Sequence, residues 1–352
     1  MPAIFKFEWI NMYHNDQSWS LQRRKLLQAA LAASANTALG MAGLSVSAAA
    51  AAAPVRSRNT DTVRLAWGRG GLPGIARARG ILENSLGKDG IKVQWVGPFP
   101  NHAPSLQAVT GGSADFAFGG STTPALAAMI AGSPLVFTQF AVVRPRTTAI
   151  IARDGSGIDK VSDLVGKTVA VNRSGLGEFL LVAALEKYGI ARDKVRFVYL
   201  NPPDAGPAFS QGKVDAWSMW SPAVDIARVE YKAHDVFFEN RDLDFLIDFD
   251  SYVTSKRFAE ENLDIVHAVN AAYRAEGEWV SSHTQEAELL VQKDAGYSDV
   301  VRDAQAKFKR QWEFHSVNDS EFIAGFQRAA DWLSVRNILP QKVRVTDYLA
   351  KI

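Results

Sequence analysis

From Val63 onward, short strand-like runs alternate with helical segments, and this alternation limits the chain to a small set of folds. The first block offers strands at residues 63–67, 91–96, 116–118 and 135–142, separated by helices near residues 73–86, 104–109 and 124–131. Strands that alternate with helices favour parallel β/α units in a doubly wound sheet. The pattern therefore predicts an α/β fold.

The same alternation restarts after residue 148. Its strands are predicted at residues 149–152, 168–171, 195–199 and 216–220, with helices at residues 178–188, 204–211 and 221–231. A strand-like return follows at residues 250–254. The remainder is predicted to be helical, with helix ends at Gly296 and Asn337.

Two blocks and a late return strand predict two lobes, each a doubly wound sheet flanked by helices. The chain would cross between them near residues 144–148 and 249–251, where Pro145 favours an extended link. The predicted boundaries are 61–146 for the first part of lobe 1, 147–249 for lobe 2, and 250–352 for the return to lobe 1 with the C-terminal helices. The alternative is two sequential domains, with the C-terminal helices as a separate bundle.

Residues 1–53 are interpreted as an export signal. Arg23-Arg24-Lys25 precedes a weakly apolar run without charges, and the alanine tract 48–53 offers small-residue cleavage sites. The arginine pair resembles a twin-arginine signal, because Leu26-Leu27 stands where that pattern has apolar residues. Gln22 and Gln28 depart from the pattern, so general secretory export is the alternative.

Charge and composition exclude several classes of function. Residues 1–53 hold four of the 39 basic and two of the 37 acidic side chains, so the rest of the chain has zero formal net charge. Such a chain has no overall field to attract nucleic acid or an anionic membrane. No later apolar run reaches eighteen residues, which argues against a membrane span. The chain has no cysteine, which excludes thiol nucleophiles and cysteine metal sites.

Three loops that follow predicted strands combine glycine or hydroxyl residues with a helix start. They are 68–74 with Arg69, Gly70 and Gly71, 119–124 with Ser121, Thr122 and Thr123, and 172–178 with Ser174 and Gly175. Backbone N–H groups at helix N-termini can hold an anion. The alternatives are plain glycine turns and simple capping for these loops, and a dinucleotide fingerprint for the first, whose spacing is wrong.

The segment 199–227 predicts a fourth helix start. Ser221 is expected to cap a helix that has Pro222 at its first position. Trp217 and Trp220 are three residues apart on the preceding strand, so they should point to opposite faces, with Trp217 in the core and Trp220 at the cavity wall. Tyr252 on the return strand is a second candidate for that wall.

Signals for catalysis are weak. The histidines are scattered, and no nucleophile elbow or paired-histidine zinc motif occurs. Asp242, Asp244, Asp248 and Asp250 resemble a metal loop only loosely, because they lack the alternation and glycine of a calcium site. Gly166-Lys167-Thr168 precedes its strand, which excludes a phosphate loop. We therefore expect no cofactor, no metal and no enzyme.

Four motifs of the chain are distinctive: Gln211-Gly212-Lys213-Val214-Asp215-Ala216-Trp217, Asp163-Leu164-Val165-Gly166-Lys167-Thr168, Gly111-Gly112-Ser113-Ala114-Asp115-Phe116 and Asn337-Ile338-Leu339-Pro340. They resemble motifs of periplasmic aliphatic-sulfonate-binding proteins, the solute receptors of ABC importers, and of the related nitrate and taurine receptors. The resemblance covers residues 63–352. Two departures are Ser221, where relatives commonly have Asp, and Arg69-Gly70-Gly71, where they have Lys-Gly-Ser.

The resemblance implies a two-lobed type II binding-protein fold and a monomer located in the periplasm. Such a receptor would close on a sulfonate around a hinge and deliver it to the permease and ATPase of an ABC importer for sulfur acquisition. Nitrate, taurine and other small solutes are alternative ligands, and the two departures leave room for a bulkier or aromatic sulfonate. A sulfinate-cleaving desulfinase shares the fold, but that enzyme depends on a cysteine nucleophile.

We expect the sulfonate to be held mainly by neutral donors. Backbone N–H groups of Gly70, Gly71, Thr122, Ser174 and Gly175 and hydroxyls of Ser121, Thr123 and Ser221 would supply them. The full predicted ligand set is Arg69, Gly70, Gly71, Ser121, Thr122, Thr123, Ser174, Gly175, Trp220, Ser221 and Tyr252. Binding should be independent of pH between about 6 and 8, because this set has no group that titrates there.

Overall fold

The computed structural model describes residues 57–352. The export signal predicted at residues 1–53 lies outside the described residues. The described residues belong to one compact unit. None of their helices is long and apolar enough to cross a membrane.

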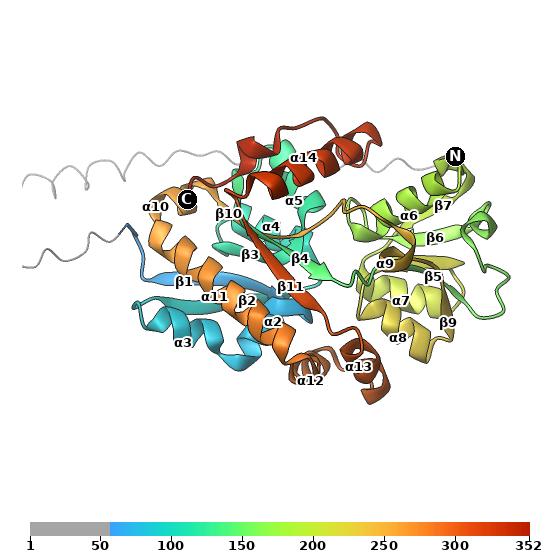
Figure 1. Ribbon diagram of the computed structural model, residues 1–352, viewed down its shortest axis with the longest axis horizontal. Helices are drawn as coiled ribbons and strands as arrows, with labels where there is room; N and C mark the ends of the chain where they lie inside the picture. Colours follow the sequence, from blue (N-terminus) through green and yellow to red (C-terminus); the bar gives the residue numbers. More distant parts are fainter. Residues whose placement is uncertain (1–56) are drawn as a thin grey trace, which may run out of the picture. The chain divides into compact units, whose positions relative to one another are not determined.

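A six-stranded sheet is built from both ends of the described chain (Figure 1). Its strand order is β11-β4-β10-β3-β1-β2. β1 pairs in parallel with β2 and β3, whereas β10 runs antiparallel to β3 and β4, and β11 antiparallel to β4. The strands are β1 (Thr62–Gly68), β2 (Lys92–Phe99), β3 (Phe116–Ser121), β4 (Leu135–Arg144), β10 (Asp250–Ser255) and β11 (Gln311–Ser316).

A five-stranded sheet is built from the middle of the chain, in the order β7-β6-β8-β5-β9. β6 pairs in parallel with β7 and β8, and β5 runs antiparallel to β8 and β9. The strands are β5 (Ala149–Arg153), β6 (Thr168–Val171), β7 (Arg196–Tyr199), β8 (Ala216–Met219) and β9 (Ala233–Phe238).

Helices cover these sheets in an α/β arrangement. The helices that follow strands of the first sheet are α2 (Gly71–Arg79), α3 (Ile81–Gly87), α4 (His102–Thr110) and α5 (Thr122–Ile130). Those of the second sheet are α6 (Leu176–Lys187), α7 (Pro202–Ser210), α8 (Ala223–Glu230) and α9 (Glu239–Asp242). The C-terminal helices are α10 (Lys256–Glu261), α11 (Leu263–Ser282), α12 (Thr284–Ala295), α13 (Asp299–Ala306) and α14 (Ser320–Val335).

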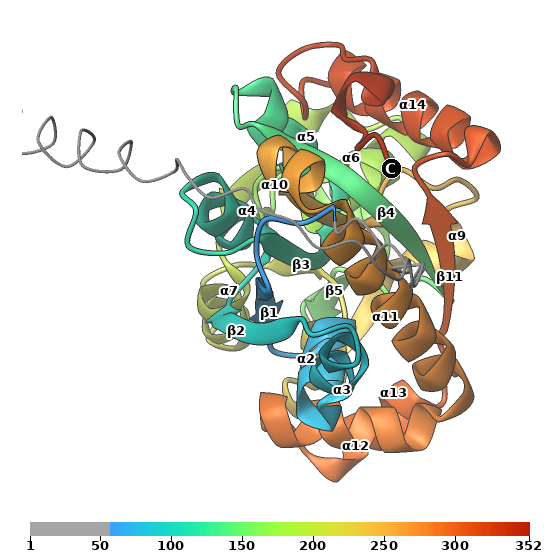
Figure 2. The same cartoon turned by 90° about the vertical axis from the view of Figure 1, so that its left-hand side faces the viewer.

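The six-stranded sheet has an apolar layer on each face. On one face Phe137 and Phe140 pack against Phe326 of α14. On the other face Leu65 belongs to the same core cluster as Tyr273 of α11. Figure 2 shows α11 beside α2 and α3, with which it makes tertiary contacts. Because β strands alternate their side chains between faces, one strand such as β4 supplies both layers.

The two-lobed α/β fold was predicted, but three details differ. Both sheets are mixed rather than parallel. Gly80 divides the helix expected at residues 73–86, because its left-handed conformation (φ 63°) ends α2. Two strands were missed, β9 and β11, and β11 lies in the region expected to be helical after residue 254. The alternating burial of Gln311–Ser316 is a strand signal that the helical neighbours obscured.

The chain passes from β4 to β5 between Arg144 and Ala149, and it re-enters the first sheet at Asp250. Strands from residues 62–144 and 250–316 belong to one sheet, and those from residues 149–238 to the other. The boundaries 61–146, 147–249 and 250–352 stay a prediction.

Candidate functional site

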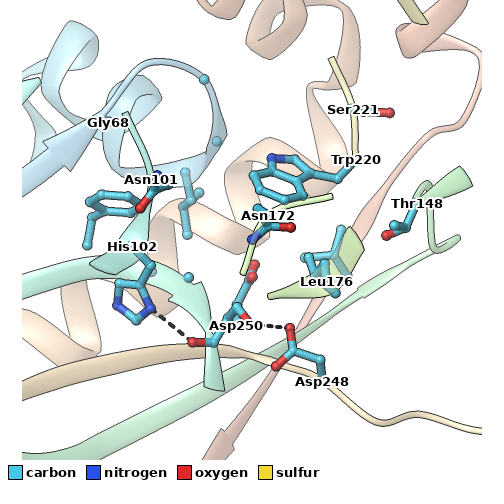
Figure 3. A pocket seen from close by; sticks show the side chains of 18 of the residues that line it. Gly68, Asn101, His102, Thr148, Asn172, Leu176, Trp220, Ser221, Asp248 and Asp250 are labelled. Atoms are coloured by element: carbon cyan, nitrogen blue, oxygen red, sulfur yellow. Dashed lines mark hydrogen bonds between the residues drawn. The ribbon is translucent and has the colours of Figure 1, made fainter. Parts of the chain in front are cut away.

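A cavity of about 550 Å³ lies where strands of both sheets end. Its lining includes Gly68 at the end of β1 and Ser121 at the end of β3. The second sheet contributes Asn172 after β6, Asn201 after β7 and Trp220 after β8. Carboxyl ends of strands are the usual place for ligands in open α/β sheets. Figure 3 shows Asn101, Asn172, Trp220 and Asp250 around the same space.

The N-terminus of α2 lines this cavity, and no described side chain accepts a hydrogen bond from its backbone N–H groups. Gly70 and Gly71 have φ of 75° and 73°, a conformation that side chains rarely tolerate. The helix has no acidic residue in its first turn and no side-chain cap. The first N–H groups of a helix have no intrahelical partner, and the helix dipole makes this end positive. Arg69 beside it is exposed and also lines the cavity.

The N-terminus of α5 looks similar in sequence, but an anion is built into it. The Asp248 carboxylate accepts hydrogen bonds from the hydroxyls of Ser121, Thr122 and Thr123 and from the Thr123 N–H. The Thr122 N–H donates to the Phe249 carbonyl at 3.0 Å. The expectation that these donors await a ligand is therefore wrong. Thr122 and Thr123 are fully buried and do not line the cavity. Of the three residues, only Ser121 faces it.

The N-terminus of α6 is intermediate between these two. The Ser174 N–H donates to the Glu178 carboxylate at 2.6 Å. It is therefore not available to a ligand, contrary to the prediction. The Asn172 side chain lies against Gly175 and accepts from the Gly177 N–H at 3.1 Å. Ser174 lines the cavity but Gly175 does not.

The aromatic residues divide as the strand alternation predicts. Trp217 is 2% exposed and packs against Phe209, with ring centroids 6.0 Å apart. Trp220 and Tyr252 line the cavity. The Tyr252 ring packs on Tyr273 at a centroid distance of 4.9 Å.

Ser221 was expected to cap α8, but it does not. The helix begins at Ala223 and has Pro222 in its N-cap position, without a side-chain cap. Ser221 instead lines the cavity. Its hydroxyl is buried and has no hydrogen-bond partner in the part of the chain that the structure describes.

Gly119 and Gly120 serve packing. A Cβ on Gly120 would lie 2.7 Å from the His102 ring, and one on Gly119 would lie 3.0 Å from the Tyr252 ring. The Nδ1 atom of His102 lies 2.9 Å from the Ser121 carbonyl, so this nitrogen carries the proton. Burial lowers the pKa of His102 to about 4 against the raising effect of that hydrogen bond. His102 is therefore a neutral part of the wall at pH 7.

Besides Arg173 in the loop before α6, four charged residues of the lining lie outside the predicted ligand set. Arg146 pairs with buried Glu239 at 3.0 Å, and Arg310 pairs with buried Glu288 at 2.6 Å. The other two are Asp248 and Asp250. Arg146 and Asp250 lie within the two predicted crossings and Asp248 directly precedes the second, which was the available signal, because residues at lobe crossings border the space between lobes. Arg310 precedes the missed strand β11.

Asp250 differs from the other three charges because its carboxylate has no hydrogen bond or ion pair within residues 57–352. Burial raises the pKa of Asp250 to about 6. Arg146 and Arg310 act against this rise, and Asp248 adds to it. Burial also lowers the pKa of Arg146, but Glu239, Asp248 and Asp250 together raise it above the ordinary value.

Three further polar atoms of the wall are buried without a hydrogen-bond partner among the described residues: Nε2 of Gln305, Nε2 of His102 and Nε of Arg310. A ligand with hydrogen-bonding atoms would satisfy such groups, which are rare in folded proteins. No group of three metal-ligating side chains occurs among the described residues. The loose acidic cluster at residues 242–250 is divided, because Asp248 is used at α5 and Asp242 pairs with Arg241.

Comparisons with known proteins agree with this geometry. Residues 86–287 match a family model described as "NMT1/THI5 like". An aliphatic sulfonates-binding protein of Escherichia coli is 28% identical over 309 residues, 87% of this chain and 93% of that protein. A protein of the same name from Bacillus subtilis is 27% identical over 78% of this chain and 80% of that protein.

Solved structures give the same fold. The crystal structure of the periplasmic aliphatic sulphonate binding protein of Escherichia coli is 25% identical, with a TM-score of 0.71, and the match covers 82% of this chain and 97% of that one. The desulfurization enzyme DSZB is 18% identical with a TM-score of 0.59, over 83% of this chain and 96% of that one. At that identity DSZB shows a shared fold and nothing finer.

Proposed function

The chain belongs to the NMT1/THI5-like family, and we propose that it is an extracytoplasmic receptor that binds sulfonates and delivers them to an ABC importer for sulfur acquisition. The observation that carries the proposal is the open N-terminus of α2 at the edge of the cavity. A sulfonate is an anion at every physiological pH, so unpaired backbone donors and a helix dipole suit it. The names of the Escherichia coli and Bacillus subtilis relatives support the same ligand class.

In this proposal the sulfonate binds to the backbone N–H groups of Gly70 and Gly71 and to the hydroxyl of Ser221. These are the members of the expected neutral-donor set that line the cavity and have no hydrogen-bond partner among the described residues. Trp220 and Tyr252 would flank the organic part of the ligand, because apolar walls tolerate different chain lengths.

The receptor is expected to close around its ligand at the two crossings. Two contacts bridge segments packed on the two sheets and would have to break when the lobes open: Asn101 donates to Asn201 at 3.1 Å, and Arg336 pairs with Glu186 at 2.6 Å. Small-angle scattering should show a smaller radius of gyration when a bound sulfonate is added. Unchanged scattering at proven saturation contradicts closure.

Calorimetric titration with ethanesulfonate, butanesulfonate, taurine and nitrate tests the ligand class. At least one sulfonate should bind, and nitrate should bind more weakly because it cannot fill a cavity of about 550 Å³. A saturating ligand at a hundredfold excess over Kd should stabilise the fold by about 2.7 kcal/mol. Binding of nitrate alone would contradict the sulfonate assignment.

The alternative is a desulfinase-like enzyme, which we consider because DSZB has a similar fold. The sulfinate-cleaving desulfinase that shares this fold depends on a cysteine nucleophile, and the chain has no cysteine. Release of sulfite from biphenyl-2-sulfinic acid by the purified protein would favour the enzyme over the receptor.

A further inference from the structure

Asp250 is the one carboxylate of the cavity wall, among the described residues, that has no partner. Asp248 is satisfied by four donors around α5. Arg146 and Arg310 also have carboxylate partners of their own, Glu239 and Glu288. The Asp250 carboxylate lines the cavity without a hydrogen bond or an ion pair to any described residue.

The backbone fixes where this carboxylate lies. Asp250 is the first residue of β10, and its register partners are Ser121 at the end of β3 and Ala141 in β4. This places it at the same sheet edge as the open N-terminus of α2, which follows β1. Figure 3 shows the Asp250 side chain directed into the space bordered by Asn172 and Trp220.

The unpaired charges of the wall are therefore of both signs. Within residues 57–352, neither Arg69 nor Arg173 has a carboxylate partner, and Arg173 stacks on Tyr199 with its guanidinium carbon 3.7 Å from the ring centroid. These two cations and the α2 N-terminus favour an anion, whereas Asp250 favours a donor or a cation. Asp250 is half-buried, and a carboxylate that loses much of its water without gaining donors is unfavourable by itself, which calls for a partner supplied from outside the chain.

We propose that Asp250 accepts a hydrogen bond from a protonated amine of the ligand, so the solute is a zwitterion that has a sulfonate at one end and a cationic nitrogen at the other. The sulfonate end rests on the proposed function. The size of the cavity leaves room for a carbon spacer between the two charges and for substituents on the nitrogen.

Three charged groups act on Asp250: Arg146 between β4 and β5, Asp248 before β10, and Arg310 before β11. The neutral phenol of Tyr252 on β10 is the fourth titratable group that faces it, and burial raises the pKa of this phenol well above its ordinary value. With a pKa of about 6, Asp250 is mostly ionised at pH 7.5 and mostly protonated at pH 5. Recognition of an amine should therefore weaken as the pH falls through 6.

Calorimetric titration with 3-aminopropanesulfonate and propanesulfonate tests the proposal, because the two differ only in the ammonium group. At pH 7.5 the wild-type protein should bind the amino compound at least about tenfold more tightly, since a hydrogen bond to a charged group is worth that much or more. In Asp250→Asn the ratio should fall below about twofold. The control Asp244→Asn removes an exposed carboxylate outside the cavity lining and should keep the wild-type ratio.

The opposite result is equally specific. If both sulfonates bind wild type with equal affinity, or if Asp250→Asn keeps the preference, the role of Asp250 is wrong while the sulfonate receptor stands. If neither compound binds, the proposed function fails and this inference with it. Measurement of the wild-type ratio at pH 5 and pH 7.5 keeps the test decisive if Asp250→Asn does not fold.

Discussion

Two helix N-termini in one cavity wall differ in what satisfies them. At α5, the Asp248 carboxylate accepts hydrogen bonds from Ser121, Thr122 and Thr123. At α2, Gly70 and Gly71 lead into a first turn without an acidic residue or a side-chain cap. Both follow a strand and both look like anion sites in sequence. The difference is made by one residue that lies 126 positions after Thr122.

The comparison teaches that a helix start is a ligand site only if the chain has not already supplied the anion. An intramolecular carboxylate is always present at high effective concentration, so it excludes a dilute ligand from the same donors. The α5 end therefore stabilises the fold and fixes the segment that enters β10. The α2 end keeps its donors for a solute.

The largest expected effect comes from removing the anion built into α5. Asp248→Ala leaves three hydroxyls and a backbone N–H without their acceptor, and it removes a negative charge near Arg146. The free energy of unfolding should fall by about 3 to 5 kcal/mol, as for other broken buried charge networks. Urea denaturation measures it, with Asp244→Ala expected within about 0.5 kcal/mol of wild type. A loss below about 1 kcal/mol would show that α5 does not need its carboxylate.

Asp250→Asn should have the opposite sign, although Asp250 is only two residues away. Its folded pKa of about 6 lies above the usual value for Asp, so the folded state binds the proton more tightly. This group stabilises the fold at low pH, and the contribution is lost as the pH rises through 6. The uncharged amide should therefore raise the free energy of unfolding at pH 7.5 by about 1 to 3 kcal/mol, at 1.36 kcal/mol per pKa unit.

The measurement is urea denaturation of the ligand-free protein at pH 7.5 and pH 4. The gain should nearly vanish at pH 4, where Asp250 is protonated in the wild type. His102 titrates in the opposite sense over the same range, since its folded pKa is lowered to about 4. Because both proteins contain His102, the difference between them isolates Asp250. An Asn variant less stable than wild type at pH 7.5 would contradict the assignment of Asp250 as an unpaired charge.

The sequence predicted the two-lobed α/β fold and the core position of Trp217, because periodicity and strand alternation are local properties. It could not predict that the hydroxyls of Thr122 and Thr123 donate hydrogen bonds to Asp248, because this partner comes from a distant segment. Asp250 was considered only as part of a loose metal loop. A charged residue beside a predicted crossing was the signal for it, but its lack of partners appears only when all nearby side chains are placed. β11 was missed because its alternation is short and lies between helices.

Ser121→Ala separates the two helix ends at a single hydroxyl. If Ser121 were a ligand donor, as first expected, binding would weaken by about 1 to 2 kcal/mol. Because its hydroxyl donates to Asp248, we now expect the loss in stability instead, at about 1.5 kcal/mol, with Kd changed by less than about twofold. Denaturation and calorimetry on the same preparation give both numbers. Weaker binding with unchanged stability would restore Ser121 to the ligand site.

Arg69→Ala gives the smallest effect and tests the open end itself. Arg69 is exposed beside α2, so its charge is screened by water and should add only about 1 kcal/mol, or roughly a fivefold change in Kd. Stability should stay within about 0.5 kcal/mol, because the guanidinium has no partner to lose. The matched variant is Arg173→Ala, whose side chain faces the same cavity from the second sheet but stacks on Tyr199. If either substitution abolishes binding, a fixed cation carries recognition, and the neutral donors of α2 only shape the site.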